Sequence, residues 1–466
     1  MLSQLYRRAI LPGFETIVKG RKKFSYWREL ERSQWLSRKA IEELQFERLR
    51  NLISYAFENC PYYAETWRAL GLRPNDLIAP DSFARWPLVD REVIRTHRLN
   101  MRSTEPDMHL IAKTTGGSSG EPLHFDLNED SNDRRAAASF RGYAWADAAP
   151  GTKQWYLWGA PPAGAQTRLQ RLKEHLYHQW LYRHHIANSF SFSEQAVPVF
   201  LRHLDRCRPH VIVAYTTPLY EFARSLKERG DIPFSPRSIV VGAEKIHDFQ
   251  RALIEEVFHA PVFETYGSRE FMLMGAECDR HEGLHLAAEN LLLEIVDDDG
   301  LPTPAGEEGN VVITDLFNYG MPFIRYVNGD RAVAGFTDCA CGRGLPVLRR
   351  VVGRQLDVVT TPDGRRIPGE FFVYVLKDFA SVRRFQVLQD RPGRIEIKLA
   401  VNDRWSAKDQ SLLERQVRPQ VGSAVELLLS EVDEIALTGV GKLQVVRNTC
   451  PQNGRMETTA SLPTRA

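Results

Sequence analysis

Several stretches of the sequence have residue types that could bind an anion such as phosphate. Residues 114–120 read TTGGSSG, in which glycines let backbone N–H groups turn toward an anion and hydroxyls add further donors. The run is not a phosphate loop of the GxxxxGK[ST] type, because no lysine follows at the required place. Taken alone, such a run is more often an ordinary loop, so other parts of the sequence have to decide.

Four further stretches add aromatic, acidic and basic residues. TYGSRE contains Tyr266 and Glu270, NGDRA contains Asp330 in a predicted tight turn after a strand, GRQLD contains Arg354, and GVGKLQVV contains Lys442. Each residue also has a purely structural interpretation, as a core tyrosine, a turn residue or a solvated charge. Their joint order and spacing favour one shared site.

The elements that must position these residues alternate in the central part of the chain. Buried strands are predicted at 154–158, 211–215, 238–242, 261–267, 310–316 and 323–327, with helical stretches between several of them. This alternation predicts a mostly parallel sheet covered by helices. Ligands of such sheets bind beyond the carboxyl ends of the strands, which is where AEK, GSRE and NGD follow.

Both ends of the chain have a different pattern. Residues from about 25 to 100 are predicted to be helical, with Ser37 as an N-cap, Pro61 ending that helix, and a second helix starting at Asp90. From residue 353 onward the pattern is strand, strand, helix, strand, which is typical of a small α+β domain. We therefore expect a large domain at 1–353, helical to about residue 100, and a small domain at 354–466.

Composition narrows the class of protein. The 61 Lys and Arg residues nearly balance 59 Asp and Glu residues, so no overall charge points to nucleic acid. No apolar run is long enough to span a bilayer, and no secretory signal is recognisable. The segment 1–24 is rich in basic residues, which fits an amphipathic membrane-surface segment. Such segments are more often solvated helices. Six cysteines in 466 residues argue against a disulfide scaffold, and a cytoplasmic location is expected.

Cysteines and histidines form two clusters. CACGRG contains Cys339 and Cys341, and ECDRHEGLHL contains Cys278, His281 and His285. Thiolate and imidazole ligands suit tetrahedral Zn²⁺, but the spacing is not that of a standard zinc finger, so ordinary reduced cysteines remain the alternative. We prefer His285 to His281 as a ligand, because GLHL is a predicted strand start and DRHEG a charged turn. Four protein ligands would make the site structural.

The order of the motifs TTGGSSGEP, VVGAEK, ETYGSRE, RYVNGDRA, RVVGRQLD and GVGKLQV resembles the adenylate-forming enzyme superfamily. Within it the chain is most similar to the phenylacetate–coenzyme A ligase branch and its relatives from capsular-polysaccharide gene clusters. The resemblance extends from about residue 35 to about residue 450. It implies an α/β fold, in which a large N-terminal domain has mixed and parallel sheets covered by helices and the small C-terminal α+β domain is mobile.

The resemblance also implies roles for single residues. The ATP β- and γ-phosphates would be enclosed by Thr114, Thr115, Gly116, Gly117, Ser118, Ser119 and Gly120. The adenine and the acyl pocket would be bordered by Gly242, Ala243 and Glu244. Tyr266 would stack on the adenine, and Gly267 would also belong to the nucleotide-binding residues. Glu270 would be a catalytic residue that holds Mg²⁺, Asp330 would accept the ribose hydroxyls, and Arg354 would lie near the ribose. Lys442 would be the catalytic lysine that meets the carboxylate and the α-phosphate.

The implied reaction is ATP-dependent formation of an acyl adenylate from a small carboxylic acid, followed by transfer to coenzyme A. The charge that develops on the phosphoryl oxygens requires Mg²⁺, backbone donors and a cation. An aromatic or apolar acid is a guess from the abundance of such residues. A homodimer is possible, and no nucleic acid partner is expected. The branch includes members with a Cys/His zinc site, which favours zinc at Cys278, His285, Cys339 and Cys341.

The sequence departs from the pattern of the superfamily at two places. Leu123 and His124 follow Pro122 where many relatives carry a lysine, and Leu356 with Asp357 replaces a pair of acids at the hinge. The hinge would then be formed by Gln355, Leu356 or Asp357.

One alternative function is an adenylating enzyme whose acceptor is an amine, hydroxyl or protein thiol in polysaccharide or secondary-metabolite biosynthesis. The other is a non-catalytic nucleotide- or zinc-binding scaffold, which the presence of Glu270, Asp330 and Lys442 disfavours.

Overall fold

The computed structural model describes residues 5–115, 123–159, 173, 176–189, 194–354, 358–363, 366–376, 379, 381–436 and 444–450. The chain separates into two compact units. The first holds residues 1–115, 122–328 and 332–351, and the second holds 116–121, 329–331 and 352–466. The assignment of ATP and acyl binding to residues 1–353 and of the catalytic lysine to residues 354–466 stays a prediction.

The N-terminal part of the first unit is helical, as its capping residues predict. It contains α2 (Leu11–Gly13), α3 (Lys23–Ser33), α4 (Arg38–Asn59), α5 (Pro61–Ala69) and α6 (Arg91–His97). The Ser37 hydroxyl accepts the N–H of Ala40 at 3.2 Å, and the Asp90 carboxylate accepts the N–H of Val93 at 2.8 Å. Both predicted helix starts are confirmed. Pro61 ends one helix as expected but also begins α5, where its missing N–H costs nothing.

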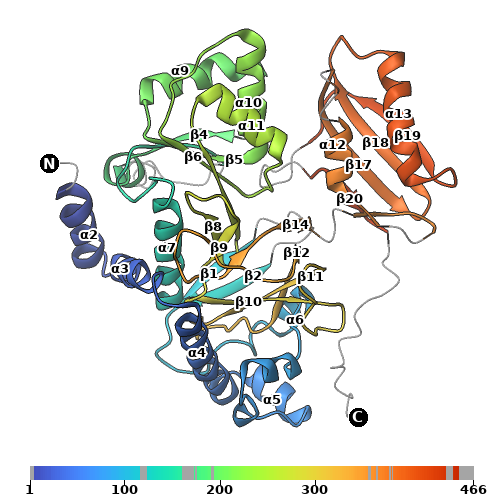
Figure 1. The fold of residues 1–466 in the computed structure, drawn as a ribbon. Coiled ribbons are helices and arrows are strands. Elements are labelled where there is room, and N and C mark those ends of the chain that lie inside the picture. Colours follow the sequence, from blue (N-terminus) through green and yellow to red (C-terminus); the bar gives the residue numbers. More distant parts are fainter. Residues whose placement is uncertain are drawn as a thin grey trace. The chain divides into compact units, whose positions relative to one another are not determined.

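An eight-stranded sheet forms the centre of the first unit (Figure 1). Its strands, in spatial order, are β13 (Val347–Leu348), β9 (Leu284–Leu286), β8 (Met272–Glu277), β7 (Val262–Ser268), β6 (Ser238–Gly242), β5 (Val211–Tyr215), β3 (Gln154–Trp158) and β4 (His184–Asn188). The five strands from β7 to β4 are parallel, whereas β8, β9 and β13 pair antiparallel. The sheet is therefore mixed, and β7 is the strand at which it changes direction.

Helices cover the parallel half of this sheet, as the alternating pattern predicted. They are α9 (Val197–Cys207), α10 (Thr216–Arg229) and α11 (Asp248–Phe258) (Figure 1). Their apolar faces bury Phe200, Leu204, Phe222 and Phe258 against the strands. Helix α7 (Glu129–Ala144) packs beside β8, where Gly142 leaves room for the side chain of Leu273.

A second sheet joins β10 (Leu291–Val296), β11 (Glu308–Asp315), β12 (Tyr326–Val333) and β14 (Val351–Arg354), and a hairpin joins β1 (Leu110–Thr114) to β2 (His124–Asn128). The predicted strand 323–327 was misplaced, since β12 begins only at Tyr326. The preceding Arg325 has a φ of 50°, which interrupts an extended backbone. Asp330 lies within β12, so the predicted tight turn was wrong. Gly329 has a φ of 83° there, which only glycine adopts without strain.

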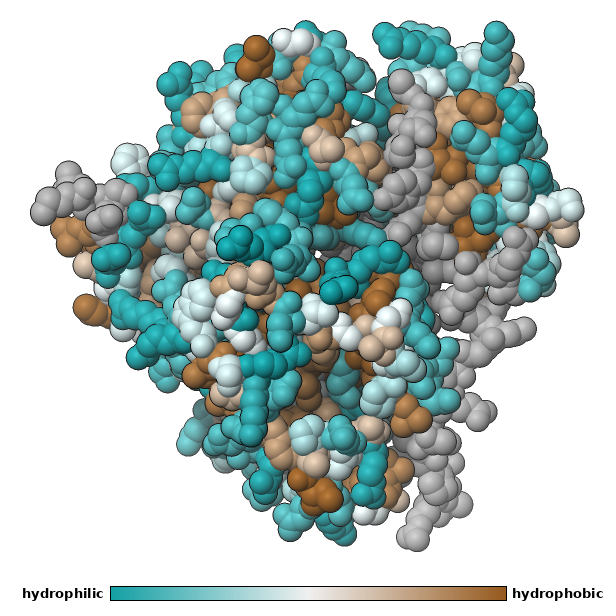
Figure 2. All heavy atoms as spheres, in the orientation of Figure 1, coloured by the Kyte–Doolittle hydropathy of each residue, from teal (hydrophilic) through white to brown (hydrophobic). Residues whose placement is uncertain are grey.

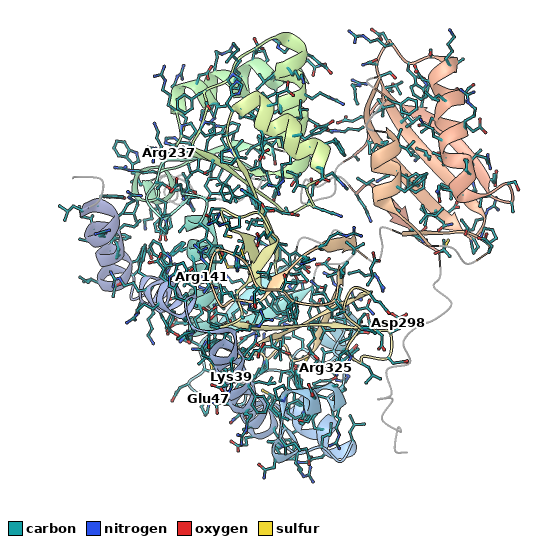
Figure 3. The ribbon with its side chains drawn as sticks, in the orientation of Figure 1. Lys39, Glu47, Arg141, Arg237, Asp298 and Arg325 are labelled. Carbon is teal, nitrogen blue, oxygen red and sulfur yellow. The ribbon has the colours of Figure 1, made fainter. Side chains whose placement is uncertain are left out.

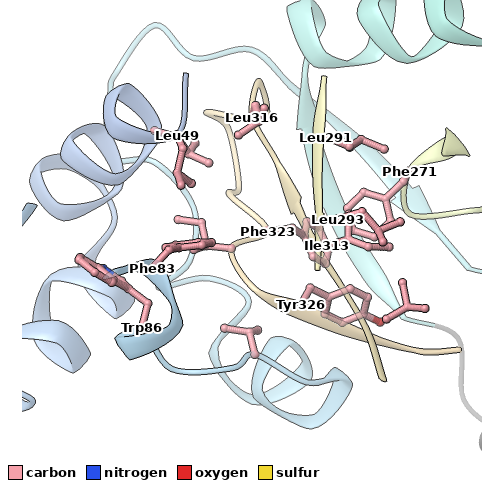
Figure 4. Close-up of a cluster of buried hydrophobic side chains, with 14 of the residues drawn as sticks. Leu49, Phe83, Trp86, Phe271, Leu291, Leu293, Ile313, Leu316, Phe323 and Tyr326 are labelled. Atoms are coloured by element: carbon pink, nitrogen blue, oxygen red, sulfur yellow. The ribbon is translucent and has the colours of Figure 1, made fainter. Parts of the chain in front are cut away.

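The largest core cluster lies between the N-terminal helices and the second sheet (Figure 4). Leu49, Phe83 and Trp86 come from the helical part, and Ile313 and Tyr326 from the strands. The buried Arg325, labelled in Figure 3, ties the two layers together. Its guanidinium donates to the carbonyls of Ala84 (2.8 Å), Trp86 (2.7 Å) and Gly300 (2.7 Å) and pairs with Glu294 at 3.1 Å. A charge this deep needs such partners, because an unpaired buried ion costs several kcal/mol.

The second unit contains the predicted strand, strand, helix, strand unit. These elements are β17 (Val382–Arg391), β18 (Arg394–Val401), α13 (Ala407–Val421) and β19 (Glu426–Val432), with β20 (Val446–Asn448) completing a four-stranded sheet. A small hairpin of β15 (Val358–Thr360) and β16 (Arg366–Pro368) and helix α12 (Gly369–Leu376) precede them. Among the described helices of the chain, none has both the length and the apolar character of a membrane span.

Candidate active site and metal cluster

The three residues Gly242, Ala243 and Glu244, which we call the GAE stretch, lie where β6 ends. A Cβ on Gly242 would stand 2.5 Å from the Thr265 hydroxyl on β7, so only glycine fits between these neighbouring strands. Ala243 follows with a φ of 70°, an uncommon conformation for a residue with a side chain. Such outliers persist where the surroundings impose them, often at functional sites. The sequence therefore makes a sharp backbone turn at the carboxyl edge of the sheet, where parallel α/β sheets bind their ligands.

Glu244 is anchored to the start of α10 from both its main chain and its side chain. Its carbonyl accepts the hydroxyl of Thr216 at 3.0 Å, and its carboxylate accepts the N–H of Thr217 at 2.9 Å. A carboxylate at a helix N-terminus is stabilised by the free N–H groups there. This pairing holds the loop after β6 against the loop after β5.

Tyr266 lies on β7, next to the GAE stretch across the β6–β7 pair. Its side chain is buried, and its hydroxyl accepts the side-chain amide of Asn328 at 3.1 Å. A Cβ on Gly267 would overlap the carbonyl of Met272, so the β7–β8 turn requires glycine there. The parallel register places Val241 opposite Glu264, so the ends of β6 and β7 lie at the same edge. The structure therefore brings Gly242, Ala243, Glu244, Tyr266 and Gly267 to one place.

Glu270 and Asp330 are both buried, each with 9% of its surface exposed. The main chain at Glu270 is fixed by Arg135, which donates to the Glu270 carbonyl and pairs with Asp315 at 2.5 Å. Asp330 lies on β12 in the second unit. Thr114 ends β1, and the hydroxyl of Thr115 directly after it accepts hydrogen bonds from the N–H of Leu123 (2.9 Å) and from Arg91 (2.7 Å). The two ends of the glycine-rich segment are thus held together.

Several predicted site residues lie outside the described residues, and for Arg354 only the backbone at the end of β14 is described. Those outside are Gly116, Gly117, Ser118, Ser119, Gly120, Gln355, Leu356, Asp357 and Lys442.

A pocket of about 440 Å³ opens beside β7 in the first unit. Its charged lining residues are Lys245, Glu264, Glu277, His281, Glu282, Asp338, Arg349 and Arg350. Burial, followed by repulsion from Glu277, raises the pKa of Glu264 to about 7. Glu277 itself accepts two hydrogen bonds from Arg251, at 2.9 and 3.0 Å, and contacts His281 at 3.1 Å. The two carboxylates therefore have different environments in one pocket.

The four predicted metal ligands come together at the antiparallel end of the sheet. Cys278 follows β8, His285 lies on β9, and Cys339 and Cys341 lie in the turn before β13, whose Val347 pairs with His285. Their ligand atoms all lie within 4.8 Å of one another. His281, the alternative ligand, contacts Glu277 instead.

The distances within this cluster fit a tetrahedral ion. The Sγ atoms of Cys278 and Cys339 are 3.7 Å apart, and Sγ of Cys341 is 3.3 Å from Nε2 of His285. Zinc–ligand bonds of about 2.3 Å to sulfur and about 2.1 Å to nitrogen give ligand separations of about 3.8 and 3.6 Å in a tetrahedron. A disulfide would need about 2.05 Å between the sulfurs, so the three cysteines are free thiols that can bind a metal together with the histidine.

Two of the four ligands have pKa shifts that suit a metal, whereas burial raises the pKa of Cys278 and Cys339 in the absence of an ion. Burial and the nearby Arg343 and Arg141 lower the pKa of His285 to about 4, so its imidazole is neutral, which is the form that binds metals. Burial would raise the pKa of Cys341, but hydrogen bonds from Arg343 outweigh it and lower that pKa. Backbone N–H groups of Arg280 and Cys341 point at the sulfurs of Cys278 (3.4 Å) and Cys339 (3.5 Å), as supporting donors of bound thiolates do.

Sequence reasoning missed Glu264, Glu277 and Asn328. A signal for Glu264 was available, because it lies two residues before Tyr266 in a predicted strand and so points to the same face. The roles of Glu277 and Asn328 depend on pairing between distant segments, which no local pattern shows.

Comparisons with known proteins show what the chain as a whole is similar to. The chain is 25% identical to the phenylacetate–coenzyme A ligase of Thermus thermophilus over 380 residues, covering 79% of this chain and 83% of that protein. It is 22% identical to protein CapK of Staphylococcus aureus over 348 residues, covering 71% of each. A structure of 2-hydroxyisobutyryl-CoA ligase in the postadenylation state matches with a TM-score of 0.68 at 19% identity, covering 87% of this chain and 89% of that one. Residues 359–449 match the family of CapK C-terminal domains.

The chain has the adenylate-forming ligase fold. The resemblance to phenylacetate–coenzyme A ligases and CapK, first indicated by the order of the motifs, is confirmed by these relatives. The expected α/β architecture of a large N-terminal part and a smaller C-terminal α+β part is confirmed as well.

Replacing Glu264 with glutamine should change how stability depends on pH. The raised pKa means that the folded state binds this proton more tightly than the unfolded chain. The contribution of Glu264 to the wild-type free energy of unfolding therefore falls as the pH rises from about 4.5 to about 7, and it stays constant above about pH 7. A glutamine side chain cannot ionise. The variant should therefore gain about 1–3 kcal/mol relative to wild type on going from pH 5 to pH 8, measured by urea unfolding. Glu282→Gln changes an exposed residue of the same pocket and is the control. If the free energy of unfolding of Glu264→Gln differs from that of wild type by the same amount at both pH values, the raised pKa of Glu264 is contradicted.

Proposed function

We propose that this protein activates a carboxylic acid with ATP, forming an acyl adenylate and pyrophosphate, and then transfers the acyl group to coenzyme A. The observation that carries the proposal is the placement of the GAE stretch and Tyr266 at one edge of a sheet whose fold is that of adenylate-forming ligases. The named relatives and the ligase structures support the same AMP-forming chemistry.

The chain's own residues have distinct tasks in this reaction. Tyr266, held by Asn328, stacks on the adenine, and Asp330 accepts the ribose hydroxyls. The segment Thr114–Gly120 donates backbone N–H groups to the β- and γ-phosphates, and Arg354 lies near the ribose. Lys442 brings a positive charge to the carboxylate and the α-phosphate as negative charge develops there. Mg²⁺, held by Glu270, supplies further charge neutralisation when bound. We place the reaction in the cytoplasm, where ATP is available.

The acid is proposed to be aromatic or apolar. Trp158 and Tyr215 end the neighbouring strands β3 and β5 at the same edge as the GAE stretch, and their ring centroids are 4.1 Å apart. Burial and then the Glu244 carboxylate raise the pKa of Tyr215, so its hydroxyl stays neutral. Flat aromatic faces stack well on flat or apolar acyl groups. Sedimentation of the protein tests separately whether it forms a homodimer.

A second candidate keeps the adenylation step but changes the acceptor to an amine, hydroxyl or protein thiol. The match of residues 359–449 to CapK C-terminal domains favours keeping it. A panel of carboxylic acids assayed for pyrophosphate release, with and without coenzyme A, tests both candidates. Acid-dependent pyrophosphate release accelerated by coenzyme A supports the first candidate, and release without a coenzyme A effect supports the second. No release with any acid contradicts both.

We also propose that Zn²⁺ is held by Cys278, His285, Cys339 and Cys341 as a structural ion that joins β8, β9 and the turn before β13. The donor set and its spacing support this. With four protein ligands there is no open coordination position, so the site stabilises rather than reacts.

Protein purified without a histidine tag should contain about one zinc per chain, measured by elemental analysis. Cys339→Ser should lose the metal and lower the thermal midpoint, because binding energy of the ion is also folding energy. Cys450→Ser, at a half-buried cysteine outside the cluster, should keep both. Well-folded wild-type protein without any bound metal contradicts the proposal.

Asp330→Ala should weaken ATP binding by about 1–3 kcal/mol, because it removes a buried charged acceptor. Isothermal titration calorimetry with a non-hydrolysable ATP analogue measures the loss directly. Asp299→Ala, at an exposed aspartate, serves as the control and should bind as wild type does. Unchanged affinity in Asp330→Ala would show that this carboxylate does not contact the nucleotide.

Lys442→Ala should slow adenylate formation by roughly 10²–10³-fold, the scale of losing one transition-state donor. Acyl transfer from a preformed acyl adenylate should change much less, because the lysine is proposed to act only in the first step. Both half-reactions are measured on the same variant, beside Lys408→Ala, an exposed lysine of the same unit. An equal loss in both half-reactions is incompatible with this role.

A further inference from the structure

The N-terminal segment of the chain exposes an unusual number of large apolar side chains. It is helical through η1 (Tyr6–Ile10), α2 and η2 (Phe14–Val18). The neighbouring η5 (Leu176–Leu181) exposes two more. Together they form what we call the N-terminal apolar surface, with exposed fractions of 84% for Ile17, 73% for Trp180, 65% for Val18, 57% for Leu5, 54% for Ile10 and 48% for Leu176. Figure 2 shows hydrophobic side chains at the left edge, beside the N-terminal end of the chain.

This surface is held in place by a buried carboxylate. Glu15 is fully buried, accepts the hydroxyls of Tyr177 (2.6 Å) and Tyr182 (2.9 Å), and pairs with Lys23 at 2.9 Å. The Tyr6 hydroxyl contacts the carbonyls of Trp180 and Leu181. An ionised carboxylate is buried only where such partners compensate its lost hydration. The N-terminal helix and η5 are therefore fixed against each other, which places their exposed apolar side chains in one region of the molecule.

The residues that flank this surface in the sequence are mostly basic. Arg7, Arg8, Lys19, Arg21 and Lys22 flank it in sequence, and Glu15 is the only acidic residue among the first 24. Glu15 is buried and pairs with Lys23 at 2.9 Å and with Arg21 at 3.6 Å, whereas Arg8, Lys19 and Lys22 are exposed. Exposed apolar side chains among basic ones are the pattern of segments that lie in the interface of an anionic bilayer.

A second copy of the chain fits this surface less well. A two-fold interface would place each patch opposite itself, which brings the same basic residues face to face. Lipid phosphates instead compensate these charges, and the tryptophan at position 180 has the amphipathic ring that prefers the interface. Charge complementarity thus selects a lipid surface over self-association.

We propose that the N-terminal apolar surface docks on an anionic lipid bilayer. Ile17, Val18 and Trp180 enter the boundary between headgroups and acyl chains, and Arg8, Lys19 and Lys22 contact the lipid phosphates. The proposal does not depend on which acid or acceptor the ligase uses. Docking would carry the reaction to the bilayer surface.

Full-length protein mixed with vesicles tests the proposal by co-sedimentation. We expect binding to vesicles of phosphatidylcholine with phosphatidylglycerol, much weaker binding to phosphatidylcholine alone, and a loss of binding at high salt. Ile17→Ser should weaken binding about ten-fold, because it removes an apolar side chain that enters the bilayer. Lys19→Gln should weaken it about five-fold, the effect of one basic residue near an anionic surface.

Ile232→Ser is the matched control, because Ile232 is also 84% exposed and lies far from this surface in sequence. It should bind vesicles as wild type does, and thermal unfolding should show that all variants are folded. Equal losses for Ile17→Ser and Ile232→Ser, or equal binding to both vesicle types, overturn the proposal. An absence of vesicle binding overturns the proposal as well. This includes the outcome in which the protein without lipid forms a dimer that Ile17→Ser dissociates.

Discussion

Strand β7 is the element on which both sites depend. It pairs in parallel with β6, where Val241 lies opposite Glu264, and antiparallel with β8, where Thr265 lies opposite Ala276. The parallel pairing brings the Tyr266 motif beside the GAE stretch. The antiparallel pairing returns the chain at once through β8 to Cys278. Gly242 is needed for this close approach, because a side chain there would collide with Thr265.

The same strand links the pocket to the cysteine and histidine cluster through one carboxylate. Glu277 ends β8, directly before Cys278, and accepts the backbone N–H of Glu264 at 2.7 Å as well as the Arg251 guanidinium. Its position is therefore set from β7, from α11 and from the turn that carries His281. An ion at the cluster would hold the far end of this arrangement, so the cluster would stabilise the edge of the proposed nucleotide site without touching the reaction.

Local patterns predicted the parts of the fold that local physics determines. Ser37 and Asp90 were predicted as helix caps, and the strands at 154–158, 211–215 and 238–242 have the predicted bounds. The position of β12 was wrong because the φ of Arg325 is fixed by distant partners such as Ala84 and Gly300, which a sequence window does not contain. The order of the motifs predicted the resemblance to phenylacetate–coenzyme A ligases and CapK, and the choice of His285 with three cysteines matched a cluster of four. Glu264 and Glu277 were missed because their environment arises from pairing across β7 and β8.

The central claim is that the carboxylate attacks the α-phosphorus of ATP to form an acyl adenylate. Its most direct test uses the acid that reacts in the carboxylate panel, labelled with ¹⁸O in its carboxyl group. The bridging oxygen of an acyl adenylate comes from the acid and leaves with AMP when the acceptor attacks the acyl carbon. We therefore expect one labelled oxygen per AMP by mass spectrometry. Unlabelled AMP, or label found in inorganic phosphate together with ADP, would contradict the account.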